Sequence, residues 1–201
     1  MPAAVHFWFD YSCPYAYLAS TQVAALAQRT GASLVYEPML LGGVFRAVGT
    51  PQRMFAELSP PKAKHNVLDM QRWADLFGVP LVMPEGHPLR TVEALRATLL
   101  TGIDPRVING FYQAYWVHGR GPSEEATMRD VLRAAGHDAS AILARLNEAK
   151  EDLRRRTDEA IALGIFGAPA FVVGKDLYWG QDRIEFVEKA LRALESGSKA
   201  G

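Results

Sequence analysis

Short runs of apolar and aromatic residues mark both ends of the chain, and apolar positions between them recur at helical spacing. Residues 5–9 predict a buried strand. A helix is expected to follow, because Pro14 suits the first helical position and the apolar face that begins there ends before Gly31. Residues 34–37 predict a second strand, which ends at Pro38.

The middle of the chain carries helical periodicity, whereas its end returns to strands. The predicted helices cover residues 62–77, 91–101, 105–117, 123–135 and 138–163. Residues 171–173 and 177–179 predict the two strands of a hairpin, which a last helix over residues 183–194 and a disordered polar tail over residues 196–201 follow. This order predicts an α/β domain that is split by a helical insertion, with both ends of the chain in one sheet.

Composition and charge are those of an ordinary globular protein and exclude several functions. The chain has 201 residues, of which 49% are hydrophobic and 22% charged, and its formal net charge is zero, so no basic excess supports nucleic-acid binding. No run of about 18 apolar residues is present to span a membrane. The first residues lack the basic segment and apolar core of a signal peptide, so we expect a cytoplasmic protein. The five histidines have no paired metal spacing, and no metal site is expected.

Cys13, the single cysteine, lies where the first strand is predicted to turn into a helix. The free N–H groups and positive dipole end of that helix are expected to lower the pKa of its thiol. Far downstream, Pro169 is expected to enter a strand through a cis peptide bond after Ala168. Together the two segments indicate a thiol-handling site. The alternative is a buried structural cysteine, since free cysteine is among the most buried residue types.

Six segments carry a resemblance to a known family: FDYSCPY at residues 9–15, LLGGVF at 40–45, GVPL at 78–81, LRA at 95–97, GIFGAPAF at 164–171 and WGQDR at 179–183. In this order they resemble 2-hydroxychromene-2-carboxylate isomerases, the bacterial relatives of kappa-class glutathione transferases. The resemblance implies a thioredoxin-like α/β domain formed by residues 1–38 and 151–201, with an all-helical domain inserted at residues 39–150. It places the chain in the wider group that contains the disulfide oxidoreductase DsbA, and it implies a homodimer.

By the same resemblance, glutathione is the cofactor and binds along the strand that begins at Pro169. The backbone of Ala168 is expected to pair with the cysteinyl part of the tripeptide like an added strand. Gln181 and Asp182 are expected to hold the γ-glutamyl group, with Asp182 accepting bonds from its ammonium. The alternative for Asp182 is a cap of the last helix.

Three further positions bear on glutathione binding. Lys62 or Lys64 falls where the family has a lysine that faces the glycyl carboxylate, and the sequence does not choose between the two. The alternative is that both lysines lie on the solvent-exposed face of a helix. Thr50 stands where the family often has an asparagine that contacts glutathione.

The reaction that the resemblance implies is a cis-trans isomerisation. The thiolate of glutathione adds to an unsaturated α-keto acid, the former double bond rotates, and elimination returns glutathione. In the family this links 2-hydroxychromene-2-carboxylate with trans-o-hydroxybenzylidenepyruvate, in the breakdown of naphthalene-type aromatics. Cys13 stands where these proteins typically have a serine. Its thiol could donate to the glutathione thiolate, or ionise and form a mixed disulfide.

We expect the aromatic substrate to lie between the two domains, over Cys13. The candidate residues for the walls of this pocket are aromatic: Tyr15, Phe45, Trp73, Trp116 and Trp179. Either Arg46 or Arg90 is expected to hold the carboxylate of the substrate. The alternative for each aromatic residue is a place in the core.

Three other functions stay open. A kappa-like transferase or peroxidase would consume glutathione, and a non-catalytic module would only bind glutathione or a peptide. A DsbA-like dithiol catalyst needs a Cys-x-x-Cys pair whose second thiol resolves the mixed disulfide. Because Ala16 occupies that second position and no other cysteine exists, only a monothiol form of that chemistry remains, and an intrachain disulfide framework is ruled out.

Overall fold

Both ends of the chain meet in one four-stranded sheet. The computed structural model describes residues 3–52 and 54–198. The strands, in the spatial order β2-β1-β3-β4, are β1 (Ala4–Phe9), β2 (Ser33–Pro38), β3 (Ala170–Val173) and β4 (Asp176–Trp179). β1 runs parallel to β2 and antiparallel to β3, so that Phe7 lies opposite Tyr36 on one side and Phe171 on the other. The prediction that the two ends complete one sheet is confirmed.

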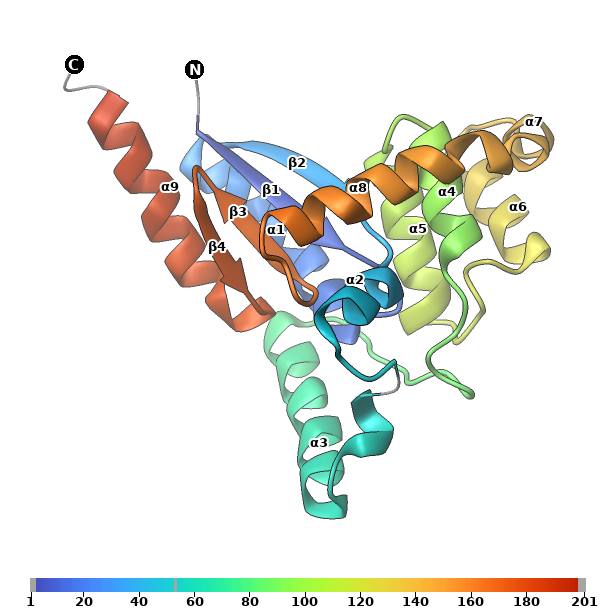
Figure 1. Ribbon diagram of the computed structural model, residues 1–201, viewed down its shortest axis with the longest axis horizontal. Helices are drawn as coiled ribbons and strands as arrows, with labels where there is room; N and C mark the ends of the chain where they lie inside the picture. The colour runs from blue at the N-terminus through green and yellow to red at the C-terminus, as the bar shows by residue number, and fades with distance from the viewer. Residues whose placement is uncertain (1–2, 53, 199–201) are drawn as a thin grey trace.

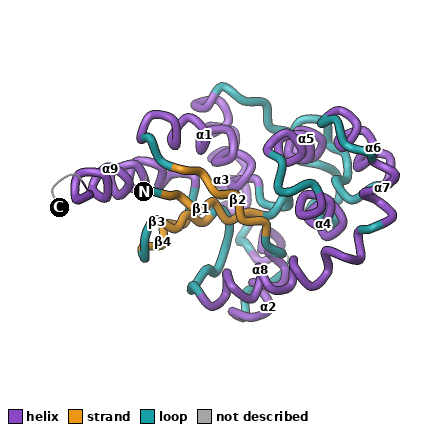
Figure 2. The backbone as a smooth tube through the Cα atoms, turned by 90° about the horizontal axis from the view of Figure 1, so that it is seen from above, coloured by secondary structure: helices purple, strands orange, loops and turns teal. Residues whose placement is uncertain are grey.

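Helices cover both faces of this sheet. On one face, α1 (Pro14–Thr30) packs against α9 (Ile184–Ser198); on the other, α8 (Lys150–Ala162) packs against β2 and against α2 (Leu41–Val48) (Figure 2). α1 has Pro14 in its first turn and ends at Gly31, whose φ of 67° is the left-handed conformation that glycine adopts without strain. This arrangement is a thioredoxin-like fold.

The remaining helices lie between β2 and α8 in the sequence. They are α3 (Pro60–Phe77), α4 (Val92–Leu100), α5 (Pro105–Trp116), α6 (Glu125–Ala134) and α7 (Ala139–Ala144), with short 3-10 turns η1 (Met54–Glu57) and η2 (Leu146–Ala149). α4 to α7 gather at one end of the molecule, whereas α3 extends away from the rest (Figure 1). A helical insertion therefore splits the sheet domain, as the sequence predicts.

An aromatic core joins the sheet to the helical end. The ring of Tyr11, which follows β1, packs 5.5 Å from Phe9 and 5.0 Å from Tyr112 on α5. Its hydroxyl is hydrogen-bonded to Thr98 on α4 at 2.6 Å, and Trp116 on α5 donates from Nε1 to its carbonyl oxygen at 2.8 Å. Contacts with the inserted helices thus hold the turn between β1 and α1. These contacts also set the position of the residues that follow Tyr11.

Two sequence predictions are wrong in detail, and one helix was missed. Residues 138–163 do not form one helix: α7 ends at Ala144, and the 3-10 turn η2, which packs on α4, separates it from α8. No glycine or proline marks this break, so periodicity could not locate it. α2 was not expected, because Gly42 and Gly43 have low helix propensity. α9 continues to Ser198 where the tail was predicted to be disordered, and residues 199–201 lie outside the described part.

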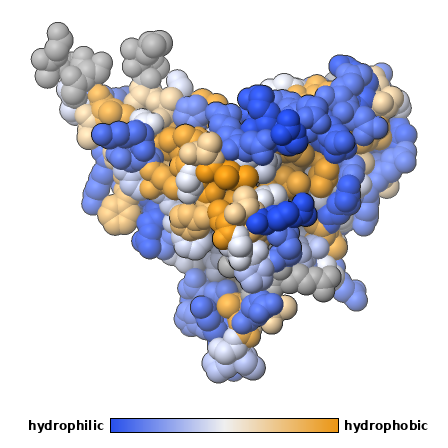
Figure 3. All heavy atoms as spheres, in the orientation of Figure 1, coloured by the Kyte–Doolittle hydropathy of each residue, from blue (hydrophilic) through white to orange (hydrophobic). Residues whose placement is uncertain are grey.

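The surface over this fold is mixed. On the face drawn in Figure 3, apolar atoms gather beside α2 and the segment that follows α8, where Leu163 and Phe166 are exposed by 48% and 44%. Within residues 3–52 and 54–198, no helix has the length and apolar character needed to cross a membrane.

Candidate active site

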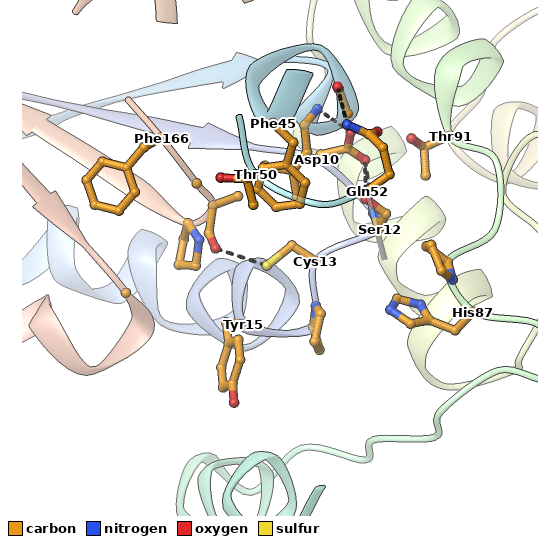
Figure 4. A pocket seen from close by; sticks show the side chains of 18 of the residues that line it. Asp10, Ser12, Cys13, Tyr15, Phe45, Thr50, Gln52, His87, Thr91 and Phe166 are labelled. Atoms are coloured by element: carbon orange, nitrogen blue, oxygen red, sulfur yellow. Dashed lines mark hydrogen bonds between the residues drawn. The ribbon is translucent and has the colours of Figure 1, made fainter. Parts of the chain in front are cut away.

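A cavity of about 970 Å³ opens where the sheet domain meets the inserted helices. Its walls come from the turn before α1, from α2 and α3, from the segment that leads into α4, and from the two segments that flank the β3–β4 hairpin. Figure 4 shows Cys13 near its centre, between Tyr15, Thr50 and His87. Segments that are distant in the sequence therefore converge on the single cysteine.

Cys13 occupies the N-cap position of α1 without a side-chain capping bond and is almost fully buried, with 7% of its surface exposed. Its Sγ atom donates a hydrogen bond to the carbonyl oxygen of Ala168 at 3.0 Å (Figure 4). Burial raises the pKa of the Cys13 thiol to about 12, although the backbone N–H groups of Tyr15 and Ala16 favour the charged form. The prediction of a lowered pKa is therefore wrong, because the cost of desolvating a thiolate exceeds the benefit of the helix end.

Asp10 holds the turn that carries Cys13. Its buried carboxylate accepts hydrogen bonds from the backbone N–H and the hydroxyl of Ser12 at 3.0 and 3.1 Å, and from the backbone N–H of Leu41 at 2.8 Å. Burial raises the pKa of Asp10, and these bonds oppose that rise. Because Leu41 is the first residue of α2, one side chain anchors both the cysteine turn and the neighbouring helix of the cavity wall.

The segment before β3 forms the wall opposite α1. The peptide bond between Ala168 and Pro169 is cis, as predicted. A Cβ atom on Gly167 would lie 2.7 Å from Nε1 of Trp179, so only glycine lets the indole lie this close to the backbone. Phe166 packs against Trp179 with ring centroids 5.0 Å apart, and both rings line the cavity. Phe166 was missed because an isolated aromatic residue in a loop gives no pattern.

Most of the residues predicted to contact glutathione lie together in this cavity. Its lining includes Thr50, Lys62, Ala168, Pro169, Gln181 and Asp182. Lys64 is exposed on α3 and is not part of the lining. Between the two lysines, the structure therefore favours Lys62 as the one near the site.

The predicted substrate walls divide into two groups. Tyr15, Phe45, Arg90 and Trp179 line the cavity, whereas Trp73, Trp116 and Arg46 do not. Trp116 is fully buried in the core, where it donates a hydrogen bond to the carbonyl oxygen of Tyr11. Trp73 packs against Phe77 on the same helix. Arg46 is on the exposed side of α2. Arg90 forms a two-pronged ion pair with Glu93, with both N–O distances at 2.7 Å.

His87 lines the cavity and was not expected there. Its Nδ1 atom lies 2.9 Å from the hydroxyl of Tyr115, and that hydroxyl accepts a hydrogen bond from the backbone N–H of Leu89 at 2.8 Å. Burial lowers the pKa of His87, so its imidazole is neutral near pH 7. A lone histidine in an irregular segment gives no sequence signal beyond the proline that follows it.

In the described parts of the chain, no three His, Cys, Asp or Glu side chains are close enough to hold a metal ion. The cavity instead combines one neutral thiol, a helix N-terminus, aromatic rings and a few charged side chains at its rim. Such a set suits an organic ligand with charged ends.

Comparison with known proteins agrees with this geometry. The family model of the DSBA-like thioredoxin domain matches residues 4–192. A 2-hydroxychromene-2-carboxylate isomerase from Pseudomonas putida is 31% identical over 195 residues, which cover 94% of this chain and 95% of that protein. The chain belongs to the 2-hydroxychromene-2-carboxylate isomerase family, within the DSBA-like thioredoxin proteins.

Two further similar proteins bear on this family assignment. A solved structure of a 2-hydroxychromene-2-carboxylate isomerase superimposes with a TM-score of 0.87 at 29% identity, covering 98% of this chain and 99% of that one. A protein named glutathione s-transferase kappa 2, from Caenorhabditis elegans, is 26% identical over 181 residues, 82% of this chain and 78% of that protein. The family and the thioredoxin-like fold with its helical insertion are confirmed.

Proposed function

We propose that this protein is a glutathione-dependent cis-trans isomerase that interconverts 2-hydroxychromene-2-carboxylate and trans-o-hydroxybenzylidenepyruvate, or a related unsaturated aromatic α-keto acid. The observation that carries the proposal is the neutral thiol of Cys13 at the N-terminus of α1, beside Ala168 in a cavity large enough for two small molecules. The names of its relatives support the reaction, and the kappa-class relative supports glutathione.

Glutathione fits the cavity with its thiol toward Cys13. The backbone of Ala168 pairs with its cysteinyl unit as an added strand would. Asp182 accepts bonds from the ammonium of the γ-glutamyl group, with Gln181 beside it, and Lys62 faces the glycyl carboxylate. Thr50 lines the same cavity.

In this arrangement Cys13 acts as a donor rather than as a nucleophile. A free thiol with a pKa of about 8.5 is mostly protonated at pH 7, and the helix end stabilises its thiolate. The S–H group of Cys13 turns from the carbonyl of Ala168 to the sulfur of glutathione and stabilises the charge further.

The raised pKa of Cys13 favours this role over monothiol redox chemistry. With a pKa of about 12, only about one thiol in 10⁵ is ionised at pH 7. Attack on a disulfide requires the thiolate. Cys13 is therefore a poor partner for a mixed disulfide, and Ala16 supplies no resolving thiol.

The substrate enters above the glutathione sulfur. Tyr15, Phe45 and the Phe166–Trp179 pair offer apolar surface to its aromatic ring. Arg90 holds the carboxylate of the substrate, and its guanidinium group is shared with Glu93. The homodimer and the cytoplasmic location that the sequence suggests stay predictions.

The experiment is to follow the absorbance of a set of unsaturated aromatic α-keto acids with the purified protein, with and without glutathione. We expect turnover only with glutathione, and an unchanged glutathione concentration at the end. Steady loss of glutathione with a chloro-nitrobenzene or a hydroperoxide as acceptor, and no isomerisation, would favour the kappa-like transferase or peroxidase. Glutathione binding in a calorimetric titration with neither activity would favour a binding module, and failure to bind glutathione would overturn the site.

A further inference from the structure

The hydroxyl of Tyr115 connects the core of the inserted helices to the cavity. Tyr115 is on α5 and is fully buried. Its oxygen accepts a hydrogen bond from the backbone N–H of Leu89 at 2.8 Å and lies 2.9 Å from Nδ1 of His87. One buried phenol thereby fixes both the course of the segment that leads into α4 and the orientation of the His87 ring.

These contacts determine which nitrogen of His87 carries the proton. The phenol has one proton to donate, and among the described residues its hydrogen-bond partners are Leu89, which donates to it, and His87. If His87 also donated, the buried phenol proton would have no acceptor, which is costly. Tyr115 therefore donates to Nδ1, and the single proton of the neutral imidazole is on Nε2.

The ring so oriented belongs to the reaction cavity. His87 and Cys13 line the same space, and in Figure 4 the imidazole extends from the helical side of the cavity toward Cys13 and Ser12. The rings of Tyr115 and Trp116 pack against it, with centroids 5.9 and 5.2 Å away, so its plane is held. Burial, which lowers the pKa of His87, keeps it neutral.

We propose that His87 is a further catalytic residue, which donates a hydrogen bond from Nε2 to the keto oxygen of the substrate. This inference rests on the proposed isomerisation. When the thiolate sulfur bonds to the alkene carbon remote from the ketone, the π electrons of the C=C bond form the C=C bond of an enolate, and the carbonyl pair moves to its oxygen. Rotation about the former double bond follows, the electrons return, and the C–S bond breaks. No proton or electron is gained or lost overall.

A neutral donor suits this step. The keto oxygen becomes charged only in the enolate-like transition state, so a fixed donor there stabilises the transition state more than the substrate. A neutral imidazole can polarise a carbonyl oxygen without giving up its proton. Tyr115 touches no reacting atom and acts as a positioning residue, because its hydroxyl holds the proton of His87 on the far nitrogen.

The kinetic test compares His87→Leu, which removes the donor, with His87→Gln, which keeps a neutral N–H at the reach of Nε2. The matched control is His118→Leu, since His118 is exposed at the end of α5 and outside the cavity lining. We expect His87→Leu to lower kcat by about 100-fold or more, with the Kd for glutathione within about twofold of wild type. His87→Gln should recover at least about tenfold of that loss.

The inference is overturned if wild type isomerises its substrate and His87→Leu stays within about threefold of it. Absence of isomerisation by wild type itself is a different result, and it overturns the proposed function. A second measurement needs no turnover: ¹⁵N spectra of histidine-labelled protein distinguish the two neutral tautomers. We expect His87 to carry its proton on Nε2 in wild type and to lose that preference in Tyr115→Phe; a proton on Nδ1 in wild type contradicts the inference.

Discussion

Sγ of Cys13 donates a hydrogen bond to the carbonyl oxygen of Ala168 at 3.0 Å, across 155 residues of sequence. The contact joins the start of α1 to the segment before β3, so the two halves of the sheet domain meet at the site. It also shows where the thiol proton is, because a carbonyl oxygen only accepts. Cys13 is thus a donor before any ligand arrives, and the bound glutathione needs only to offer a better acceptor.

The first prediction concerns substitution of Cys13. Cys13→Ser should retain most isomerase activity, since a hydroxyl donates to a thiolate at least as well as a thiol does. Cys13→Ala removes the donor and should lower kcat/KM by about 100-fold. Both rates are measured at saturating glutathione, and circular dichroism checks that the variants are folded. Equal activity of Cys13→Ala and wild type would remove Cys13 from the mechanism.

The second prediction concerns the reactivity of Cys13, which any thiol reagent reports because it is the single cysteine. Its pKa of about 12 leaves far less thiolate at pH 7 than a free thiol has, although the more basic thiolate is the better nucleophile. Together the two effects should make alkylation by iodoacetamide about 100-fold slower than that of free glutathione.

Because the pKa of Cys13 is raised, its alkylation rate should keep increasing as the pH rises through 9 and 10, where an ordinary thiol is already ionised. The control is the same reaction in urea, where the exposed cysteine should react at the ordinary rate. Equal rates for the native and unfolded protein at pH 7, or a native rate that levels off near pH 8, would contradict the assigned ionisation state.

What the sequence predicted correctly is mainly local. β1, α1 and the β3–β4 hairpin follow from apolar runs, Pro14 and a short turn, and each of these signals lies within the element itself. The α2 helix does not follow, because its stability comes from the carboxylate of Asp10 and from packing against α8, both remote in sequence.

The candidate site shows the same division. The resemblance of the motifs brought Cys13 and Ala168 together, but the pKa of the thiol depends on how completely distant segments cover it. Trp116 and Trp179 look alike in the sequence, yet one is in the core and the other is 48% exposed beside the cavity. His87 enters the site only because Tyr115, 28 residues later, holds it there.

The third prediction tests the close approach of Trp179 to Gly167. Because a Cβ on Gly167 would lie 2.7 Å from Nε1 of Trp179, Gly167→Ala must displace the indole or the backbone before Ala168. We expect a loss of about 1–3 kcal/mol in the free energy of unfolding and a changed tryptophan fluorescence. In a Trp179→Ala background the same substitution should cost less than half as much, and an equal cost would mean that the strain arises elsewhere.

The fourth prediction compares two neighbouring arginines of α8. Arg156 reaches across to β2, where it binds Glu37 at 2.6 Å, and both side chains are less than one fifth exposed. Arg154 is 66% exposed and pairs with Glu151 and Asp158 on its own helix. Arg156→Ala leaves a largely buried carboxylate without this partner and should lower the free energy of unfolding by about 1–3 kcal/mol. Arg154→Ala should cost much less, because its ion pairs are exposed to solvent.

Added salt distinguishes the two variants further, because it screens exposed charges more than buried ones. In urea titrations, 1 M sodium chloride should remove most of the effect of Arg154→Ala and leave most of that of Arg156→Ala. The pairing of Arg156 with Glu37 matters for the site, since Glu37 lies in β2 just before the chain enters α2 and the cavity wall. Equal losses for the two variants at low salt would show that the ion pair between α8 and β2 adds no more to stability than an exposed pair does.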